Sequence, residues 1–394
     1  MVNLISRMAR FLQRRGSLGR AKHRWLLVLA VGVLHSAASG QDLQPELNEQ
    51  IITVVKKGSL FSFDLETTLY KPDGDGPFPV ALVNHGKAAG DPRFQARYRP
   101  GSAVRFFLQR GYAVVVPMRQ GFSKSSGNYI GGGCNVLSNG RLQAEDAKAV
   151  LDWVVTQPWA DKDRMLVLGQ SHGGWTTLSL GSVGYPGVKG LVNFAGGLRQ
   201  ESCPGWESNL ARAAGDLGKD TKLPSLWFYG DNDSYFPPRV FKPMFEQYQA
   251  GGAKAELFEF GVFGNDAHGM FGSRNGERIW QPKVTAFMQT LGLPTEVLNS
   301  KFGIVKTMEV PPKTDFADLL DIGKIPFIKE SGKAGYKNYL TRQQPRAFAI
   351  APSGSWGWAE MGDDPLARAL ANCNRNAKGD CKLYSVDDTV VWQP

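Results

Sequence analysis

The sequence predicts an α/β fold, in which a mostly parallel sheet is flanked by helices and a small extension domain follows at the C-terminus. Short apolar runs such as PVALVNHG, YAVVVP and MLVLG alternate with helical patterns. Such alternation favours parallel strands covered on both faces. After about Leu293 the pattern changes to PPKTDFADLLDIGKIPF and then to a tail that contains Gly, Trp and Cys. We therefore expect a large α/β domain over residues 41–297 and a small domain of unknown role over residues 298–394.

The first forty residues predict a secretory signal peptide. Residues 1–40 contain seven Lys or Arg and no acid, and the apolar stretch WLLVLAVGVL is followed by small residues. A run of this length is typical of a signal sequence and is too short to cross a bilayer. We expect cleavage after Ala38 or Gly40, export to the periplasm or the medium, and no membrane span afterwards. An uncleaved N-terminal anchor is the alternative.

The net charge does not indicate a nucleic-acid partner. Subtracting the seven basic residues of the signal from the formal net charge of +10 leaves +3 for the rest of the chain. The remaining sequence has no basic stripe that would follow a phosphate backbone. The oligomeric state is left open.

The predicted elements follow one another along the chain. FSFDLET alternates with a period of two, which is typical of a strand with one buried face. The continuous apolar runs are typical of fully buried strands; they are PVALVNHG, YAVVVP, MLVLG, GLVNFAGG, PSLWFYGD and AELFEF. Helices are predicted at 102–110, in RLQAEDAKAVLDWVVTQP, in GGWTTLSLGSV and at 279–291, and a loop rich in Gly and Ser at 121–140.

The stretch GQSHGG, residues 169–174, predicts a catalytic serine. It joins the strand MLVL to the helix GGWTTLSL, and a G-x-S-x-G turn in that setting thrusts the serine above the sheet edge. Gly169 and Gly173 are expected because side chains there would collide with neighbouring backbone. The pattern therefore favours Ser171 as a nucleophile over an ordinary strand-to-helix turn.

Position and elimination predict His268 as the general base. Two of the five histidines leave with the signal, and His172 is expected to point away from Ser171 inside the same turn. His85 ends an earlier strand, whereas His268 lies in NDAHGMF beyond a strand's carboxyl end, where a base belongs.

The orienting acid is expected between the serine and the histidine in sequence. The segment WFYGDNDSYFPP offers two candidates, Asp231 and Asp233. The backbone N–H of His172, the residue after the serine, is expected to donate to the oxyanion.

These stretches together resemble the α/β-hydrolase superfamily, within its dienelactone-hydrolase and prolyl-oligopeptidase-like branch. The resemblance covers about residues 50–293 and is carried by NHG (84–86), VVPMRQGFSKSSG (115–127), DKDRMLVLGQSHGG (161–174), GDNDSYFP (230–237) and AHG (267–269). It implies the acid pattern G-x-x-D-x-x-x-P, which selects Asp233, and a second oxyanion donor at the backbone N–H of Lys87. One departure is the serine, since dienelactone hydrolases proper carry a cysteine nucleophile; a true dienelactone substrate is not expected.

The expected function is that of an exported serine hydrolase that cleaves small-molecule carboxylic esters through an acyl-enzyme, without a metal or organic cofactor. A peptidase of the prolyl-oligopeptidase type is the first alternative. Such enzymes usually carry a large propeller domain before the hydrolase domain, and only about 10 residues separate the signal from the first strand here. A catalytically silent binding protein on the same fold is the second alternative.

Four cysteines in an exported chain predict two disulfides. Cys373 and Cys381 are close in sequence, with Gly379 available for a turn. Cys134 and Cys203 each follow a predicted strand, so we expect them at one sheet edge, tying together two lid segments at 131–134 and 201–206. A zinc site is disfavoured because no CxxC pair exists; free thiols remain the alternative.

Aromatic residues crowd the predicted site. They could line an acyl pocket, although core packing is the better expectation for any single one; they are Trp175, Phe194, Trp206, Trp227, Tyr235 and Phe236.

Overall fold

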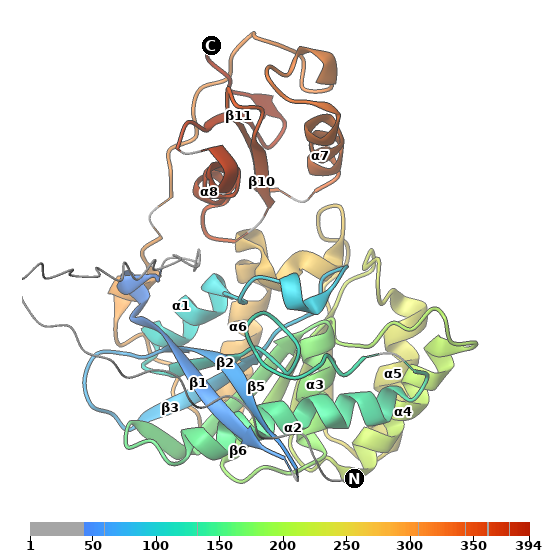
Figure 1. Ribbon diagram of the computed structural model, residues 1–394. Coiled ribbons are helices and arrows are strands. Elements are labelled where there is room, and N and C mark those ends of the chain that lie inside the picture. The colour runs from blue at the N-terminus through green and yellow to red at the C-terminus, as the bar shows by residue number, and fades with distance from the viewer. Residues whose placement is uncertain are drawn as a thin grey trace, which may run out of the picture. The chain divides into compact units, whose positions relative to one another are not determined.

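The computed structural model describes residues 43–394, except residues 59, 132, 306, 343, 361 and 378. The signal peptide predicted at residues 1–40 lies outside the described residues. In the part that is described, the chain forms an eight-stranded sheet and a four-stranded sheet (Figure 1). None of the helices in these ranges combines the length and the hydropathy that a bilayer span requires.

The large sheet has the strand order β1-β2-β4-β3-β5-β6-β7-β8. Pairings from β4 through β8 are parallel, whereas β1 and β2 pair antiparallel at one side. The strands are β1 (Glu49–Lys57), β2 (Ser62–Tyr70), β3 (Phe78–Asn84), β4 (Ala113–Pro117), β5 (Ala160–Gln170), β6 (Val188–Phe194), β7 (Ser225–Tyr229) and β8 (Ala255–Glu259). The predicted α/β class with a mostly parallel sheet is confirmed.

Helices connect these strands and cover both faces of the sheet (Figure 1). They are α1 (Gly101–Gln109), α2 (Val136–Val154), α3 (His172–Gly181), α4 (Trp206–Asp220), α5 (Pro238–Ala250) and α6 (Arg274–Thr290). Short 3₁₀ turns add η1 (Pro45–Leu47), η2 (Pro92–Phe94), η3 (Ala267–Gly272), η4 (Ser300–Gly303) and η5 (Ile322–Lys324).

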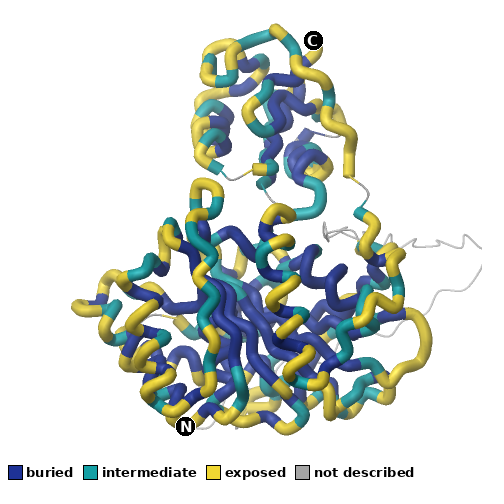
Figure 2. Tube along the Cα trace, turned by 180° about the vertical axis from the view of Figure 1, so that it is seen from behind, coloured by how far each residue is buried: buried dark blue, intermediate teal, exposed yellow. Residues whose placement is uncertain are grey.

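Adjacent residues of a strand enter different cores, because side chains alternate across a sheet. On one face, Leu166 of β5 packs with Phe107 of α1 and Trp280 of α6. On the other face, the next residue, Val167, packs with Leu151 of α2. The central strands are buried along their length, as the dark tube in Figure 2 shows. This burial on both faces explains the continuous apolar runs in the sequence.

Two sequence expectations differ from the structure. Helix α2 begins at Val136, inside the stretch predicted as loop, because the side chain of Asn135 accepts a hydrogen bond from the N–H of Ser138 at 2.9 Å and caps the helix. Strand β2 is buried continuously from Leu65 to Tyr70 rather than on one face, because it lies between β1 and β4 inside the sheet.

The C-terminal part forms an antiparallel sheet in the order β10-β9-β11-β12. Its elements are α7 (Glu330–Leu340), β9 (Arg346–Ile350), β10 (Trp356–Glu360), α8 (Pro365–Ala377), β11 (Lys382–Val386) and β12 (Thr389–Val390). Helix α8 packs on the face that carries Ala347 and Ala349, and α7 packs on the face that carries Phe348. The domain boundary expected at residue 297 stays a prediction.

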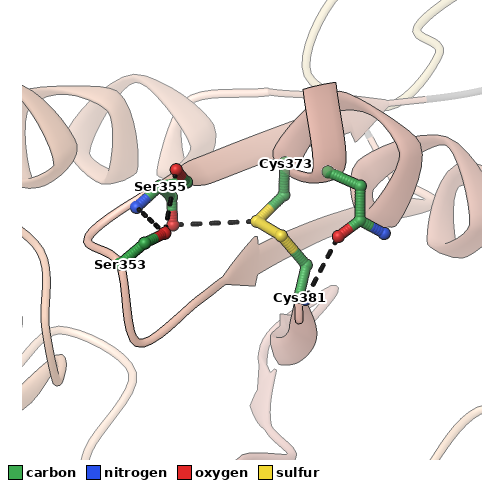
Figure 3. The surroundings of a disulfide bond; sticks show 5 residues. Ser353, Ser355, Cys373 and Cys381 are labelled. Atoms are coloured by element: carbon green, nitrogen blue, oxygen red, sulfur yellow. Dashed lines mark hydrogen bonds between the residues drawn. A yellow bond between two sulfur atoms is a disulfide. The ribbon is translucent and has the colours of Figure 1, made fainter. Parts of the chain in front are cut away.

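A disulfide between Cys373 and Cys381 closes the end of α8 onto the start of β11. Figure 3 shows it beside Ser353 and Ser355 in the loop between β9 and β10. The backbone N–H of Cys381 also donates to the side chain of Asn374 at 3.1 Å. This is the pairing that the sequence predicts for these two cysteines.

Candidate active site

The candidate residues come from different strands of the large sheet. Ser171 directly follows β5, Asp233 lies in the loop after β7, and His268 lies after β8. The segment from His85 to Lys87 follows β3. All four strands run parallel, and parallel strands bring their carboxyl ends to one edge of a sheet. The topology therefore collects the predicted site at that edge.

Ser171 occupies the turn between β5 and α3 in a strained backbone conformation. Its φ is 55° and its ψ is −125°, a combination that non-glycine residues rarely adopt. Its N–H donates to the carbonyl oxygen of Phe194 on β6 at 2.9 Å, which holds the turn against the neighbouring strand. Strain of this kind belongs to the strand-turn-helix motif that presents a nucleophile.

Two glycines of this turn are required by close packing. A Cβ atom at Gly173 would lie 2.1 Å from the carbonyl oxygen of Asn84. A Cβ atom at Gly169 would lie 2.3 Å from the carbonyl oxygen of Gly173. Both distances are far inside van der Waals contact, so the collision expected from the sequence is confirmed.

His268 is oriented by Asp233. Its Nδ1 lies 3.1 Å from each oxygen of the Asp233 carboxylate. With the proton on Nδ1, this nitrogen donates to the carboxylate and Nε2 is left as the basic nitrogen, which is the tautomer that the proposed mechanism requires. Asp233 is buried, and its Oδ1 also accepts the backbone N–H groups of Tyr235 at 2.8 Å and Phe236 at 2.9 Å. Hydrogen bonds from its own loop therefore hold the Asp233 carboxylate in place in addition to its contact with His268.

Asp231, the other aspartate that the residue pattern left open, has a different place. It is exposed, and its backbone N–H donates to the carbonyl oxygen of Gly261 at 2.9 Å. The choice of Asp233 that the family resemblance implies agrees with the contact to His268.

Two backbone N–H groups, those of His172 and Lys87, are the predicted donors to an oxyanion. His172 is the first residue of α3, and N–H groups in the first turn of a helix have no partner within the helix. The second group belongs to Lys87, directly after Gly86. A Cβ atom at Gly86 would lie 3.3 Å from the Cβ and 3.9 Å from the Oγ of Ser171, so this loop passes beside the hydroxyl.

A buried arginine that the sequence analysis missed supports the Lys87 loop. Arg119 donates from its guanidinium to the carbonyl oxygen of His85 at 2.7 Å and to Oε1 of Gln143 at 2.8 Å. Its backbone N–H donates to Nε2 of His85 at 3.0 Å. Burial lowers the pKa of Arg119 to about 10. In the sequence Arg119 is visible only as an arginine inside VVPMRQGFSKSSG. Its partners are distant in sequence, and only the fold reveals them.

The other two described histidines, His85 and His172, are buried. Burial, followed by the charge of Arg119, holds the pKa of His85 well below its usual value. The same two causes lower the pKa of His172, whose Nε2 lies 3.3 Å from Oδ1 of Asn139. A buried ring that faces other partners does not serve Ser171, which agrees with the elimination of these two histidines.

A pocket of about 410 Å³ contains both Ser171 and His268. Its lining residues are His85, Gly86, Lys87, Ala88, Gln95, Ala96, Tyr98, Met118, Gln170, Ser171, Tyr235 and His268. The Lys87 ammonium group donates to the carbonyl oxygens of Ala88 at 3.2 Å and Gly90 at 3.1 Å. Over the described residues, no cluster of three or more His, Cys, Asp or Glu is arranged to hold a metal ion.

Most of the aromatic residues that the sequence placed near the site belong to the core. Of the six, Tyr235 lines the pocket, and its ring centroid lies 4.5 Å from that of His268. Four of the others are buried in the core: Phe194 lies in one hydrophobic cluster, and Trp175, Trp227 and Phe236 lie in another. Trp206 is partly buried against the second cluster. Core packing was the correct expectation for these five.

The disulfide Cys134–Cys203 joins the segment before α2 to the segment before α4. This is the pairing that the sequence predicts. The described residues of the two expected lid segments, 131–134 and 201–206, are not among those that line the pocket. Their role as a lid therefore stays a prediction without support from the pocket's lining.

A family model described as X-Pro dipeptidyl-peptidase (S15 family) matches residues 62–250. The chain is also similar to a cocaine esterase from Rhodococcus sp. (strain MB1 Bresler). The two are 30% identical over 129 residues, which is 32% of this chain and 20% of that protein. The matched part is thus a fifth of the length of this curated relative.

Solved structures with a similar fold include esterases and peptidases. An esterase from Pyrococcus furiosus is 16% identical with a TM-score of 0.47, over 64% of this chain and 94% of that one. A putative dipeptidyl aminopeptidase IV from Bacteroides ovatus is 18% identical with a TM-score of 0.47, over 61% of this chain and 36% of that one. A putative dienelactone hydrolase from Klebsiella pneumoniae is 18% identical with a TM-score of 0.44, over 61% and 99%.

Proposed function

We propose that the chain, whose residues 62–250 match the S15 peptidase family model and whose sheet is mostly parallel, is an exported serine hydrolase of the α/β-hydrolase type that cleaves carboxylic esters of small molecules. The observation that carries this proposal is the contact of His268 Nδ1 with both oxygens of buried Asp233, in a pocket that also contains the strained Ser171. A serine hydrolase needs a nucleophile, a base and an acid that orients the base, and we assign these roles to Ser171, His268 and Asp233.

The proposed reaction follows from the positions of these groups. Ser171 Oγ attacks the ester carbonyl carbon while Nε2 of His268 takes the hydroxyl proton. The negative charge on the carbonyl oxygen is stabilised by the backbone N–H groups of Lys87 and His172. When the C–O bond breaks, the alcohol leaves with the proton from His268. Water then attacks the acyl-enzyme by the same route and releases the acid.

The lining of the pocket favours esters over peptides with a free N-terminus. A substrate ammonium group that leaves water needs a carboxylate partner, and the described residues that line the pocket include no Asp or Glu. The one lysine there, Lys87, directs its ammonium group to two carbonyl oxygens of its own loop. A mostly uncharged ester suits such a pocket better than a zwitterionic peptide.

A peptidase that acts on X-Pro substrates is the second candidate. It is favoured by the family model that matches residues 62–250, whose description names an X-Pro dipeptidyl-peptidase. A purely binding role, the third possibility, would leave the strained serine and the His268–Asp233 contact without a use.

Export is part of the proposal and is supported by the two disulfides. Disulfides persist in oxidising compartments such as the periplasm and the medium and are rare in the reducing cytosol. The signal expected at residues 1–40 would supply the route.

The test combines active-site labelling with a substrate series. Purified protein is treated with a fluorophosphonate probe, and the labelled peptide is sequenced; we expect the label on Ser171 and none on the Ser171→Ala variant. Short aryl esters, prolyl anilides and dipeptidyl X-Pro anilides are then compared by kcat/KM. Faster cleavage of the X-Pro anilides would establish the peptidase instead, and the absence of both label and turnover would leave the binding role.

A further inference from the structure

Asp266, a residue with no part in the proposed chemistry, connects the loop that contains Asp233 to the loop that contains His268. Its Oδ1 accepts the backbone N–H of His268 at 3.0 Å. The same oxygen accepts the backbone N–H of Ser234 at 3.0 Å, and its Oδ2 accepts the Ser234 hydroxyl at 2.6 Å. Ser234 directly follows Asp233. The Asp266 carboxylate thus holds both Ser234, the residue after the proposed acid, and His268, the proposed base.

The main chain of His268 is held at its other end as well. Its carbonyl oxygen accepts a hydrogen bond from Nε2 of Gln170 at 2.7 Å. Gln170 is the last residue of β5 and directly precedes Ser171. The backbone N–H of His268 is therefore tied to the acid loop through Asp266, and its carbonyl oxygen is tied to the nucleophile turn through Gln170.

The two loops have further contacts away from the catalytic groups. The backbone N–H of Phe263 donates to Oδ1 of Asn232 at 3.0 Å, and Nδ2 of Asn232 donates to the carbonyl oxygen of Gly264 at 3.1 Å. These bonds hold the loops together several residues before His268. Loss of the Asp266 carboxylate should therefore loosen the position of His268 without separating the loops.

We propose that Asp266 is a positioning residue of the triad, which sets the place of His268 relative to Asp233 and, together with Gln170, relative to Ser171. This inference depends on the proposed serine-hydrolase function. The His268 ring has one polar anchor among the bonds described, the Asp233 carboxylate, so its reach to Ser171 depends on where its backbone is fixed. A displacement of about 1 Å in a catalytic group can reduce turnover by about 10²-fold.

A simple helix cap is the competing role for Asp266, since it stands at the N-terminal end of η3. A cap needs the bond to the His268 N–H only. It does not need the two bonds to Ser234, which come from a segment 32 residues away in sequence. An alignment of the Asp233 loop with the His268 loop by the Asp266 carboxylate explains these two bonds.

The experiment measures kcat and KM for a short aryl ester with Asp266→Ala, Asp266→Asn and Ser234→Ala, beside the neighbouring exposed Asn265→Ala as the matched control. We expect Asp266→Ala to lower kcat by about 10²-fold with little change in KM. Asp266→Asn keeps an oxygen acceptor for the two N–H groups, so its kcat should be close to that of wild type. Ser234→Ala should have a smaller effect, and the control should equal wild type.

A second measurement does not depend on turnover. The Nδ1 proton that His268 shares with Asp233 should give a downfield proton NMR signal, assigned by its loss in His268→Ala. We expect Asp266→Ala to broaden or remove it while thermal unfolding and circular dichroism stay close to wild type. An unchanged signal, an unchanged kcat, or a change in KM alone would overturn the inference. If instead wild type lacks ester turnover and labelling, the proposed function fails, and the proton signal still tests the alignment.

Discussion

At the scale of single residues, the triad assignment gives the first prediction. Ser171→Ala and His268→Ala should each reduce kcat by several orders of magnitude, and the double variant should be little worse, because the two groups act as a unit. Asp233→Asn should lose more activity than Asp231→Asn, since Asp233 contacts His268. The measurement is single-turnover and steady-state kinetics on an aryl ester.

The histidine next to the serine is the control for this assignment. In the proposed mechanism His172 contributes only its backbone N–H, and its buried ring faces Asn139. His172→Gln should therefore keep substantial turnover. An inactive His172→Gln beside an active His268→Ala would show that the base has been misassigned.

The buried rings of His85 and His172 predict how stability depends on pH. Burial and the charge of Arg119 keep the pKa of both rings low in the folded protein, whereas in the unfolded chain they titrate near about 6.5. Below that pH the unfolded chain binds protons that the folded protein does not. Stability is therefore complete above about pH 6.5 and decreases as the pH falls, by up to about 1.4 kcal/mol per pH unit for each ring.

This dependence is checked by urea unfolding at pH 7.5 and pH 5. His172→Gln removes one of the two rings, so the loss of unfolding free energy between these pH values should be smaller in the variant than in wild type. Equal losses in the two proteins would contradict the prediction.

At the scale of elements, the start of α2 depends on one side chain. Asn135 accepts the N–H of Ser138 and caps the helix that the sequence pattern begins later. Asn135→Ala should lower the free energy of unfolding by about 1 kcal/mol, whereas Asn135→Asp, which keeps the acceptor, should have little effect. Denaturant unfolding of the three proteins provides the comparison, and equal stability of wild type and Asn135→Ala would exclude the cap.

The two disulfides join elements over very different lengths of chain. Cys134 and Cys203 are 69 residues apart, and Cys373 and Cys381 are 8 apart. In the chain-entropy model the longer loop contributes about 4 kcal/mol and the shorter one about 2–3 kcal/mol. Replacing the first pair by serine should therefore lower the unfolding free energy more than replacing the second.

Thermal and denaturant unfolding of the two double variants test this order. Peptide mapping without a reductant should recover these two crosslinks, and a Cys134–Cys373 crosslink would contradict the pairing. A larger loss from Cys373→Ser with Cys381→Ser would show that native-state strain or residual structure, and not loop length, decides the contribution.

At the scale of the whole molecule, export is the property to test. A bacterial host that produces the full chain should cleave it after residue 38 or 40. The protein released into the periplasm or the medium should then begin at residue 39 or 41 and contain both disulfides. The same chain without residues 1–40 should stay in the cytosol with free thiols. N-terminal sequencing and thiol alkylation distinguish the two, and a full-length, membrane-bound product would establish the alternative of an anchor.

The sequence by itself determined the fold class and the serine turn, and it predicted the serine and the histidine of the proposed triad. These features depend on local patterns and on the order of the elements along the chain. Continuous apolar runs mark strands buried on both faces, GQSHGG marks a turn that excludes Cβ atoms at Gly169 and Gly173, and the order of serine, acid and base follows the order of the strands. The choice between Asp231 and Asp233 needed the family resemblance, since two aspartates in one turn look alike until their directions are known.

Only the tertiary structure decided which groups support these residues. Arg119 contacts His85 and Gln143, and Asp266 contacts Ser234, across 24 to 34 residues of sequence. Such contacts produce no periodicity and no fixed spacing in the sequence, because they depend on which loops meet at the carboxyl edge of the sheet. The same reason explains why most of the aromatic residues placed at the site belong to the core. An aromatic residue next to a predicted site loop can point into the pocket or into the core, and only the packing of the elements decides which.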